Sequence, residues 1–390
     1  MNRKIFTLIT LLIMTVANLN AQQALWGGQA IVSPEVHDNN TVTFRFMAPD
    51  AKEVKVSGDW IPAEGWTPGA AAMTRDEKGL WSHTTAKLES DLYSYWFIVD
   101  GLRVMDPNNV YMIRDVASVF NVFITGNGKG DLYKVNQVPH GSVTRRWYDS
   151  PGNNKARRIT IYTPPGYEKS TDTYPVFYLL HGMGGDEEAW IALGRTSQIM
   201  DNLIAQGKAK PMIVVMTNGN VAQEAATGES SLGFVKPTMQ LPNTMDGKFE
   251  ETFTDVIRFV ESNYRVKSGK SGRAIAGLSM GGYHTLHISR YYPNTFDYIG
   301  LFSAAIMPNQ NVQSKVYDNF DATLKAQMDN GYKLYWIAIG KTDFLFKNNV
   351  EYRAKLDEMK MPYVYRESEG GHTWTNWRLY LSEFVPMLFK

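Results

Sequence analysis

A serine lies between glycines at residues 277–282, which read Gly-Leu-Ser-Met-Gly-Gly. The short apolar run 273–276 precedes it, and residues 283–291 after it have a helical pattern. A G-x-S-x-G sequence between a strand and a helix is typical of a sharp turn that presents its serine as a nucleophile. Such a turn needs glycine because side chains beside the serine would collide with the neighbouring strand and helix. We therefore predict Ser279 as a nucleophile at a helix N-terminus, where N–H groups favour a developing negative charge.

A nucleophilic serine needs a base to take its proton and a third group to orient that base. With this kind of turn, the partners follow in the order serine, acid, histidine. Of the seven histidines, only His372 lies beyond the candidate acids, in a glycine-flanked loop that can carry it over Ser279. Asp343 directly follows the apolar strand 334–340, so it is the preferred acid. Five other aspartates lie in the same interval and remain alternatives, namely Asp297, Asp318, Asp321, Asp329 and Asp357.

The oxyanion formed in acyl transfer needs two backbone N–H donors. One is expected from Met280, directly after the nucleophile, and the other from Met183 in the glycine-rich loop after the strand 174–180. His181, His284 and His287 are expected in local or core roles.

Three aromatic residues are the candidates for substrate binding. Trp374 and Trp377 follow His372 closely, and Tyr283 lies on the helix after Ser279. A flat phenolic acyl group would gain from stacking on such rings. The alternative is that both tryptophans anchor the last helix and that Tyr283 is buried.

Strands and helices alternate over residues 138–390, which predicts that an α/β sheet with right-handed crossovers positions these residues. Two of the expected strands, 174–180 and 212–216, are too apolar to face water, as in a parallel sheet covered on both sides. Residues 218–246 are long, polar and rich in small side chains. We interpret them as a lid or a wall of the substrate cleft.

Residues 22–125 have the pattern of an all-β domain. Short segments of alternating polar and apolar residues are separated by turn residues, which predicts a β-sandwich. Its tryptophans could stack on sugars or fill the core, namely Trp60, Trp66, Trp81 and Trp96. The glycine-rich stretch that follows predicts a linker or a long loop, and we assign residues 126–137 as a linker. We expect the chemistry to lie wholly in residues 138–390, so that small esters would be hydrolysed without the sandwich.

The amino terminus has the pattern of a secretory signal peptide over residues 1–21. Its removal would change the formal net charge from +1 to −1, because it contains two basic and no acidic residues. A near-neutral chain gives no electrostatic reason to expect nucleic acid as a partner, and no other apolar run is long enough to span a membrane. The chain has no cysteine, which excludes disulfides and thiolate metal sites, and neither a metal nor a cofactor is expected. Export without cysteine suggests a periplasmic or secreted bacterial protein, while the oligomeric state is left open.

The site motifs also carry a family resemblance. Residues 138–390 resemble the esterase D superfamily, and carbohydrate esterase family 1 in particular, through Thr163-Pro164-Pro165-Gly166-Tyr167, Tyr178-Leu179-Leu180-His181-Gly182, the Ser279 motif and Gly371-His372-Thr373-Trp374-Thr375-Asn376-Trp377-Arg378. The resemblance implies an α/β-hydrolase fold and a serine esterase with Ser279, His372 and Asp343 as its triad. It also implies a plant-polysaccharide substrate such as feruloylated arabinoxylan.

The amino-terminal domain is similar to the immunoglobulin-like modules related to carbohydrate-binding family 48. The similarity rests on Phe46-Met47-Ala48-Pro49, Val56-Ser57-Gly58-Asp59-Trp60, Gly79-Leu80-Trp81 and Tyr95-Trp96-Phe97-Ile98-Val99-Asp100-Gly101. The expected function is hydrolysis of feruloyl or other hydroxycinnamoyl esters. The alternatives are an acetylxylan esterase, a siderophore esterase that cleaves a catecholate trilactone, and a glycan-binding protein on an inactive hydrolase scaffold.

Overall fold

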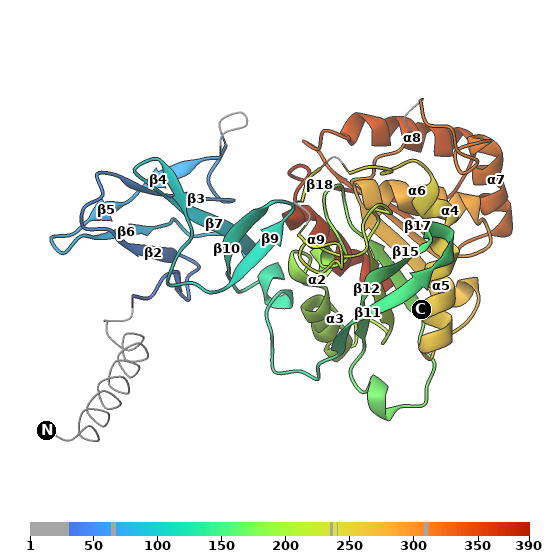
Figure 1. Cartoon of the computed structure of the whole chain (residues 1–390), viewed down its shortest axis with the longest axis horizontal. Helices are drawn as coiled ribbons and strands as arrows, with labels where there is room; N and C mark the ends of the chain where they lie inside the picture. The colour runs from blue at the N-terminus through green and yellow to red at the C-terminus, as the bar shows by residue number, and fades with distance from the viewer. Residues whose placement is uncertain (1–30, 64–67, 235–236, 240, 308–310) are drawn as a thin grey trace, which may run out of the picture.

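The structure is a computed structural model that describes residues 31–390 apart from 64–67, 235–236, 240 and 308–310. An all-β part at the amino-terminal end lies beside a larger α/β part (Figure 1). The predicted fold class, an α/β-hydrolase preceded by an all-β sandwich, is confirmed. The predicted signal peptide, residues 1–21, lies outside the described residues. Among the described helices, none is both long and apolar enough to cross a bilayer.

The α/β part is built on an eight-stranded sheet in the order β11-β12-β14-β13-β15-β16-β17-β18. From β14 to β18 the strands are parallel, whereas β12 pairs antiparallel with both β11 and β14. The bounds are β11 Ser142–Ser150, β12 Lys155–Thr163, β13 Val176–Leu180, β14 Ile213–Thr217, β15 Arg273–Leu278, β16 Tyr298–Phe302, β17 Leu334–Gly340 and β18 Val364–Ser368.

Helices cover both faces of this sheet. Alternate residues of one strand point to opposite faces, so in β13 Phe177 joins one apolar cluster while Tyr178 joins the other. The first cluster includes α2 Ala189–Ala192, α3 Thr196–Ala205 and α9 Trp374–Phe384. The second includes α4 Lys248–Glu251, α5 Phe253–Asn263, α6 Met280–Tyr291, α7 Phe320–Asn330 and α8 Phe346–Glu358. Burial on both faces explains the unbroken apolar runs of the central strands.

The all-β part packs two antiparallel sheets on a core of aromatic and aliphatic side chains. One sheet has the order β1-β2-β6-β5, and the other has the order β4-β3-β7-β10-β9 with β8 paired to β7. Trp81 is buried in this core, and Trp60 stacks on Phe44 with ring centroids 5.2 Å apart. Trp66 lies outside the described residues. The bounds are β1 Glu35–Val36, β2 Val42–Met47, β3 Val54–Gly58, β4 Ala70–Ala72, β5 Thr74–Arg75, β6 Leu80–Thr84, β7 Leu92–Val99, β8 Leu102–Val104, β9 Met112–Asp115 and β10 Ser118–Ile124.

Residues 126–137, predicted as a linker or a long loop, form a loop that packs against the α/β part. This segment contains a short 3-10 helix, Lys129–Leu132, and the side chain of Tyr133 behind it is fully buried. The amide of Asn202 on α3 donates to two of its carbonyls, those of Leu132 and Lys134. The glycine-rich composition suggested flexibility, but these tertiary contacts hold the segment against the α/β part.

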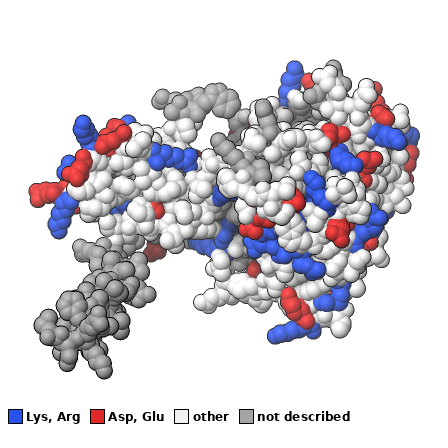
Figure 2. Space-filling model, in the orientation of Figure 1, with Lys and Arg blue, Asp and Glu red and all other residues white. Residues whose placement is uncertain are grey.

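The two parts share a hydrophobic core. Leu92, Ile113 and Val122 of the sandwich belong to the same buried cluster as the side chains of α3 and α9. Figure 1 shows β9 and β10 at this junction, and β9 contacts α2. Acidic and basic side chains are interspersed over the visible face of both parts (Figure 2).

Candidate active site

Ser279 occupies a strained turn between β15 and α6. Its backbone angles are φ 53° and ψ −114°, a conformation that costs energy for a residue with a side chain. A Cβ atom on Gly277 would lie 2.4 Å from the backbone of Gly281, and one on Gly281 would lie 2.3 Å from the Leu180 carbonyl oxygen. The glycines are therefore required by close backbone approach on both sides of the serine, as the sequence predicted.

Asp343 and His372 meet at the carboxyl ends of two adjacent strands. The register pairs Gly340 of β17 with Ser368 of β18, so the loops that follow them start side by side. Nδ1 of His372 lies 2.9 Å and 3.1 Å from the two carboxylate oxygens of Asp343. Asp343 is buried, whereas His372 is half-buried and faces a pocket that Ser279 also lines. A buried carboxylate in this position holds the imidazole with its other nitrogen free.

The expected oxyanion donors lie at the same end of the sheet. The register pairs Leu180 of β13 with Gly277 of β15, which brings the loop with Met183 next to the turn with Ser279. Met280 is the first residue of α6, where backbone N–H groups have no partner within the helix. Met183 and Met280 both line the pocket.

His181, at the start of the loop that contains Met183, is held in place by two hydrogen bonds. Its Nδ1 donates to the Gly182 carbonyl at 2.7 Å, and its Nε2 accepts from the Gly219 N–H at 2.8 Å. Burial lowers the pKa of His181 to about 4, so it stays neutral. The local role expected for this histidine therefore agrees with the structure. His284 and His287 are also buried, and each has hydrogen-bond partners in the core.

We expect this buried histidine to make folding stability pH-dependent. In the unfolded chain an imidazole takes up a proton near pH 6.5, whereas folded His181 resists protonation down to about pH 4. Stability should therefore be lost as pH falls through this window. The difference in unfolding free energy between wild type and His181→Asn should narrow by about 2–3 kcal/mol between about pH 7 and about pH 4.5. Urea denaturation at each pH measures it, and a constant difference would contradict the prediction.

The pocket above Ser279 has a volume of about 500 Å³ and a mostly apolar lining. Phe344 and Trp377 flank His372, with ring centroids 4.5 Å and 4.9 Å from the imidazole. Met239 and Met245 line it from the 218–246 segment, which agrees with a wall of the cleft. This pocket can accommodate a bulky, flat, apolar group next to the serine.

Of the three predicted substrate-binding residues, two line the pocket and one does not. Trp374 and Trp377 both line the pocket and pack edge to face at 5.2 Å. The prediction for Tyr283 is wrong, because its side chain is fully buried and packs on His287 and Tyr317. Its position on α6 was predicted, but its direction on that helix was not.

Sequence reasoning missed the contribution of the sandwich to this pocket. Asp115, the last residue of β9, and Val116 in the turn after it lie in the pocket wall. Burial raises the pKa of Asp115, and a hydrogen bond from the Trp374 side chain opposes that shift. No local motif marks these two residues, since only the docking of the two parts brings them to the site.

A family comparison agrees with the fold. Residues 150–388 match the family model Esterase, described as "Putative esterase", and the chain therefore belongs to this family. The class of enzyme that this family defines is the carboxylic ester hydrolases.

Three relatives show the range of the similarity. An endo-1,4-beta-xylanase/feruloyl esterase of Xylanibacter ruminicola is 30% identical over 92% of this chain and 46% of its own length. The chain thus spans less than half of that relative. A solved ferulic acid esterase is 26% identical, with a TM-score of 0.50 over 63% of this chain and 97% of its own. The enterobactin esterase FES of Shigella flexneri shares the fold, with a TM-score of 0.61 at 17% identity over 89% of this chain and 92% of its own.

Proposed function

We propose that this protein is a serine carboxylesterase that hydrolyses hydroxycinnamoyl esters, feruloyl esters above all, on plant cell-wall polysaccharide. The observation that carries the proposal is the meeting of Ser279 and the hydrogen-bonded pair His372 and Asp343 at one apolar, aromatic-lined pocket. The feruloyl esterase names of two relatives support the acyl group. The predicted signal peptide supports export to the periplasm or beyond, where such polysaccharide would be met.

In the proposed mechanism, the Ser279 hydroxyl attacks the ester carbonyl carbon while Nε2 of His372 accepts its proton. Asp343 holds Nδ1–H and stabilises the imidazolium that forms. The N–H groups of Met183 and Met280 bind the oxyanion. Collapse of the tetrahedral intermediate transfers the proton from His372 to the sugar oxygen, which leaves as an alcohol. Water activated by His372 then hydrolyses the acyl-enzyme and releases the free acid.

The aromatic lining favours a feruloyl over an acetyl group. A ring stacked on Trp374 or Trp377 would gain about 0.5–1.5 kcal/mol beyond its burial. Acetate is too small to fill a pocket of about 500 Å³. The alternatives that the test must separate from this proposal are an acetylxylan esterase, a catecholate trilactone esterase and an inactive glycan-binding scaffold.

The test is a hydrolysis panel with matched leaving groups. One arabinoxylan oligosaccharide is prepared in feruloylated and in acetylated form, and a catecholate trilactone is tested beside them. We expect kcat/KM for the feruloyl ester to exceed that for the acetyl ester by about ten-fold or more, from stacking and burial together. Faster deacetylation would support the acetylxylan esterase. Cleavage of the trilactone alone would support the siderophore esterase, and no hydrolysis of any ester would support the glycan-binding protein.

A further inference from the structure

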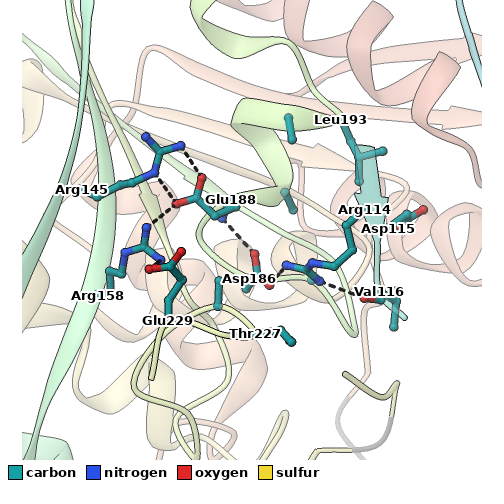
Figure 3. A pocket seen from close by; sticks show the side chains of 14 residues that line it. Arg114, Asp115, Val116, Arg145, Arg158, Asp186, Glu188, Leu193, Thr227 and Glu229 are labelled. Carbon is teal, nitrogen blue, oxygen red and sulfur yellow. Dashed lines mark hydrogen bonds and ion pairs between the residues drawn. The ribbon is translucent and has the colours of Figure 1, made fainter. Parts of the chain in front are cut away.

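A second hollow of about 530 Å³ opens beside the catalytic pocket (Figure 3). We call it the side pocket. The two hollows are adjacent, because four residues line both of them, namely Asp115, Val116, Gly185 and Ala189. A substrate held at Ser279 could therefore extend from one into the other.

The side pocket is polar, unlike its neighbour. Figure 3 shows Arg145 and Arg158 on one side and Arg114 on the other, with acidic side chains between them. Arg114 pairs with Asp186. Arg145 forms two hydrogen bonds to the Glu188 carboxylate, at 2.7 Å and 2.8 Å.

Arg158 is the most buried of the three arginines that line the side pocket. It is 6% exposed, and its guanidinium lies 3.2 Å from Glu188 and 3.4 Å from Glu229. Its Nη1 lies 3.4 Å from Glu229 and 3.5 Å from Glu187, at ion-pair distance from both carboxylates but without a well-formed hydrogen bond to either of them, so it can still donate to a ligand. Glu229 is more than half exposed at the rim and offers a carboxylate to a ligand.

These charges indicate the class of ligand. Each of the three arginines already faces a carboxylate, so the side pocket has no excess of positive charge to attract an anion. Fixed ion pairs instead present donors and acceptors close together. A neutral ligand with several hydroxyl groups can use both kinds of partner at once.

We propose that the side pocket binds the glycosyl part of the substrate while the catalytic pocket holds the acyl group. This inference rests on the proposed function. The binding site is composite, because Arg114 and Asp115 come from the sandwich, whereas Arg145 and Arg158 come from β11 and β12. The sandwich thus acts at the bond to be cleaved, by holding the sugar beside it.

The test fills the side pocket with a large side chain. Thr227 lines it and is absent from the lining of the catalytic pocket, so Thr227→Trp should displace a sugar. The measured quantity is the ratio of kcat/KM for a feruloylated arabinoxylan oligosaccharide to kcat/KM for methyl ferulate. We expect this ratio to fall by about ten-fold or more, mainly through a higher KM, because contacts to the sugar are lost.

Thr171→Trp is the matched control. Thr171 is exposed in the loop before β13, at the end of the sheet opposite Ser279, and its replacement should leave the ratio unchanged. A second variant, Glu229→Gln, keeps the side-chain size and should lower the ratio about three-fold by weakening one hydrogen bond.

Direct binding provides an independent readout. The unacylated oligosaccharide is titrated calorimetrically into Ser279→Ala and into the double variant Ser279→Ala, Thr227→Trp, and its Kd should rise about ten-fold or more in the latter. If wild type hydrolyses methyl ferulate but Thr227→Trp changes neither the ratio nor the Kd, the side-pocket inference is refuted and the proposed function stands. If wild type hydrolyses no ester, the proposed function fails, and binding of the sugar would still support the side pocket.

Discussion

Replacing Ser279 with alanine is expected to lower kcat for methyl ferulate by about 10⁴-fold or more without changing the fold. The variant loses the only hydroxyl that the strained turn presents to the pocket, so no acyl-enzyme can form. The turn itself should persist, because the flanking glycines rather than the serine side chain accommodate the close backbone approach. A residual rate above the uncatalysed reaction is expected from the oxyanion donors and substrate binding alone.

Steady-state kinetics and circular dichroism on the same preparations measure both parts of this expectation. Ser271→Ala is the matched control, since Ser271 is exposed near the opposite end of β15. That variant should keep wild-type kinetics. A Ser279→Ala protein that retained a tenth of wild-type turnover would eliminate Ser279 as the nucleophile.

Replacing Arg378 with methionine is expected to destabilise the protein by about 3–5 kcal/mol. Arg378 lies on α9, is 2% exposed, and donates to Asp91 and to the Leu92 carbonyl at the start of β7, at 3.2 Å and 2.9 Å. It also donates to the Leu193 carbonyl at 3.1 Å. Without the guanidinium, the buried Asp91 carboxylate keeps the Leu92 N–H at 2.7 Å and the ion pair with Lys129 but loses its buried cationic partner, and two carbonyls each lose a donor.

Urea denaturation followed by tryptophan fluorescence measures this loss. The matched control is Arg366→Met, because Arg366 pairs with Glu383 at the surface of the α/β part, where both side chains are about one-third exposed. Such a pair contributes about 1 kcal/mol or less. Equal losses in the two variants would show that the junction adds no special stability.

The sequence allowed the centre of the site to be predicted because its signals are local. A side chain at Gly277 or Gly281 would collide with backbone a few residues away or on an adjacent strand. Asp343 follows closely after β17, which is marked in the sequence by a clear apolar run. His372 could be chosen by chain order alone. The structure then brings His372 and Asp343 together through the pairing of β17 with β18.

The rest of the site depends on packing that no single segment encodes. Tyr283 was assigned to the pocket because α6 begins at the nucleophile, but the side chain points to the core, and the helical pattern does not reveal that direction. Asp115 and Val116 reach the pocket only through the docking of the sandwich. The glycine-rich composition of residues 126–137 likewise concealed the burial of Tyr133.

The shared core at the junction limits how this enzyme could be recombined with others. The expectation that residues 138–390 would hydrolyse small esters on their own treated the sandwich as a detachable module. A cut before residue 138 would expose side chains of α3 and α9 that share a buried cluster with Leu92. It would also remove the Asp91 carboxylate from Arg378 and take away one wall of the pocket. In this chain, exchanging either part alone would therefore require its side of the junction to be redesigned.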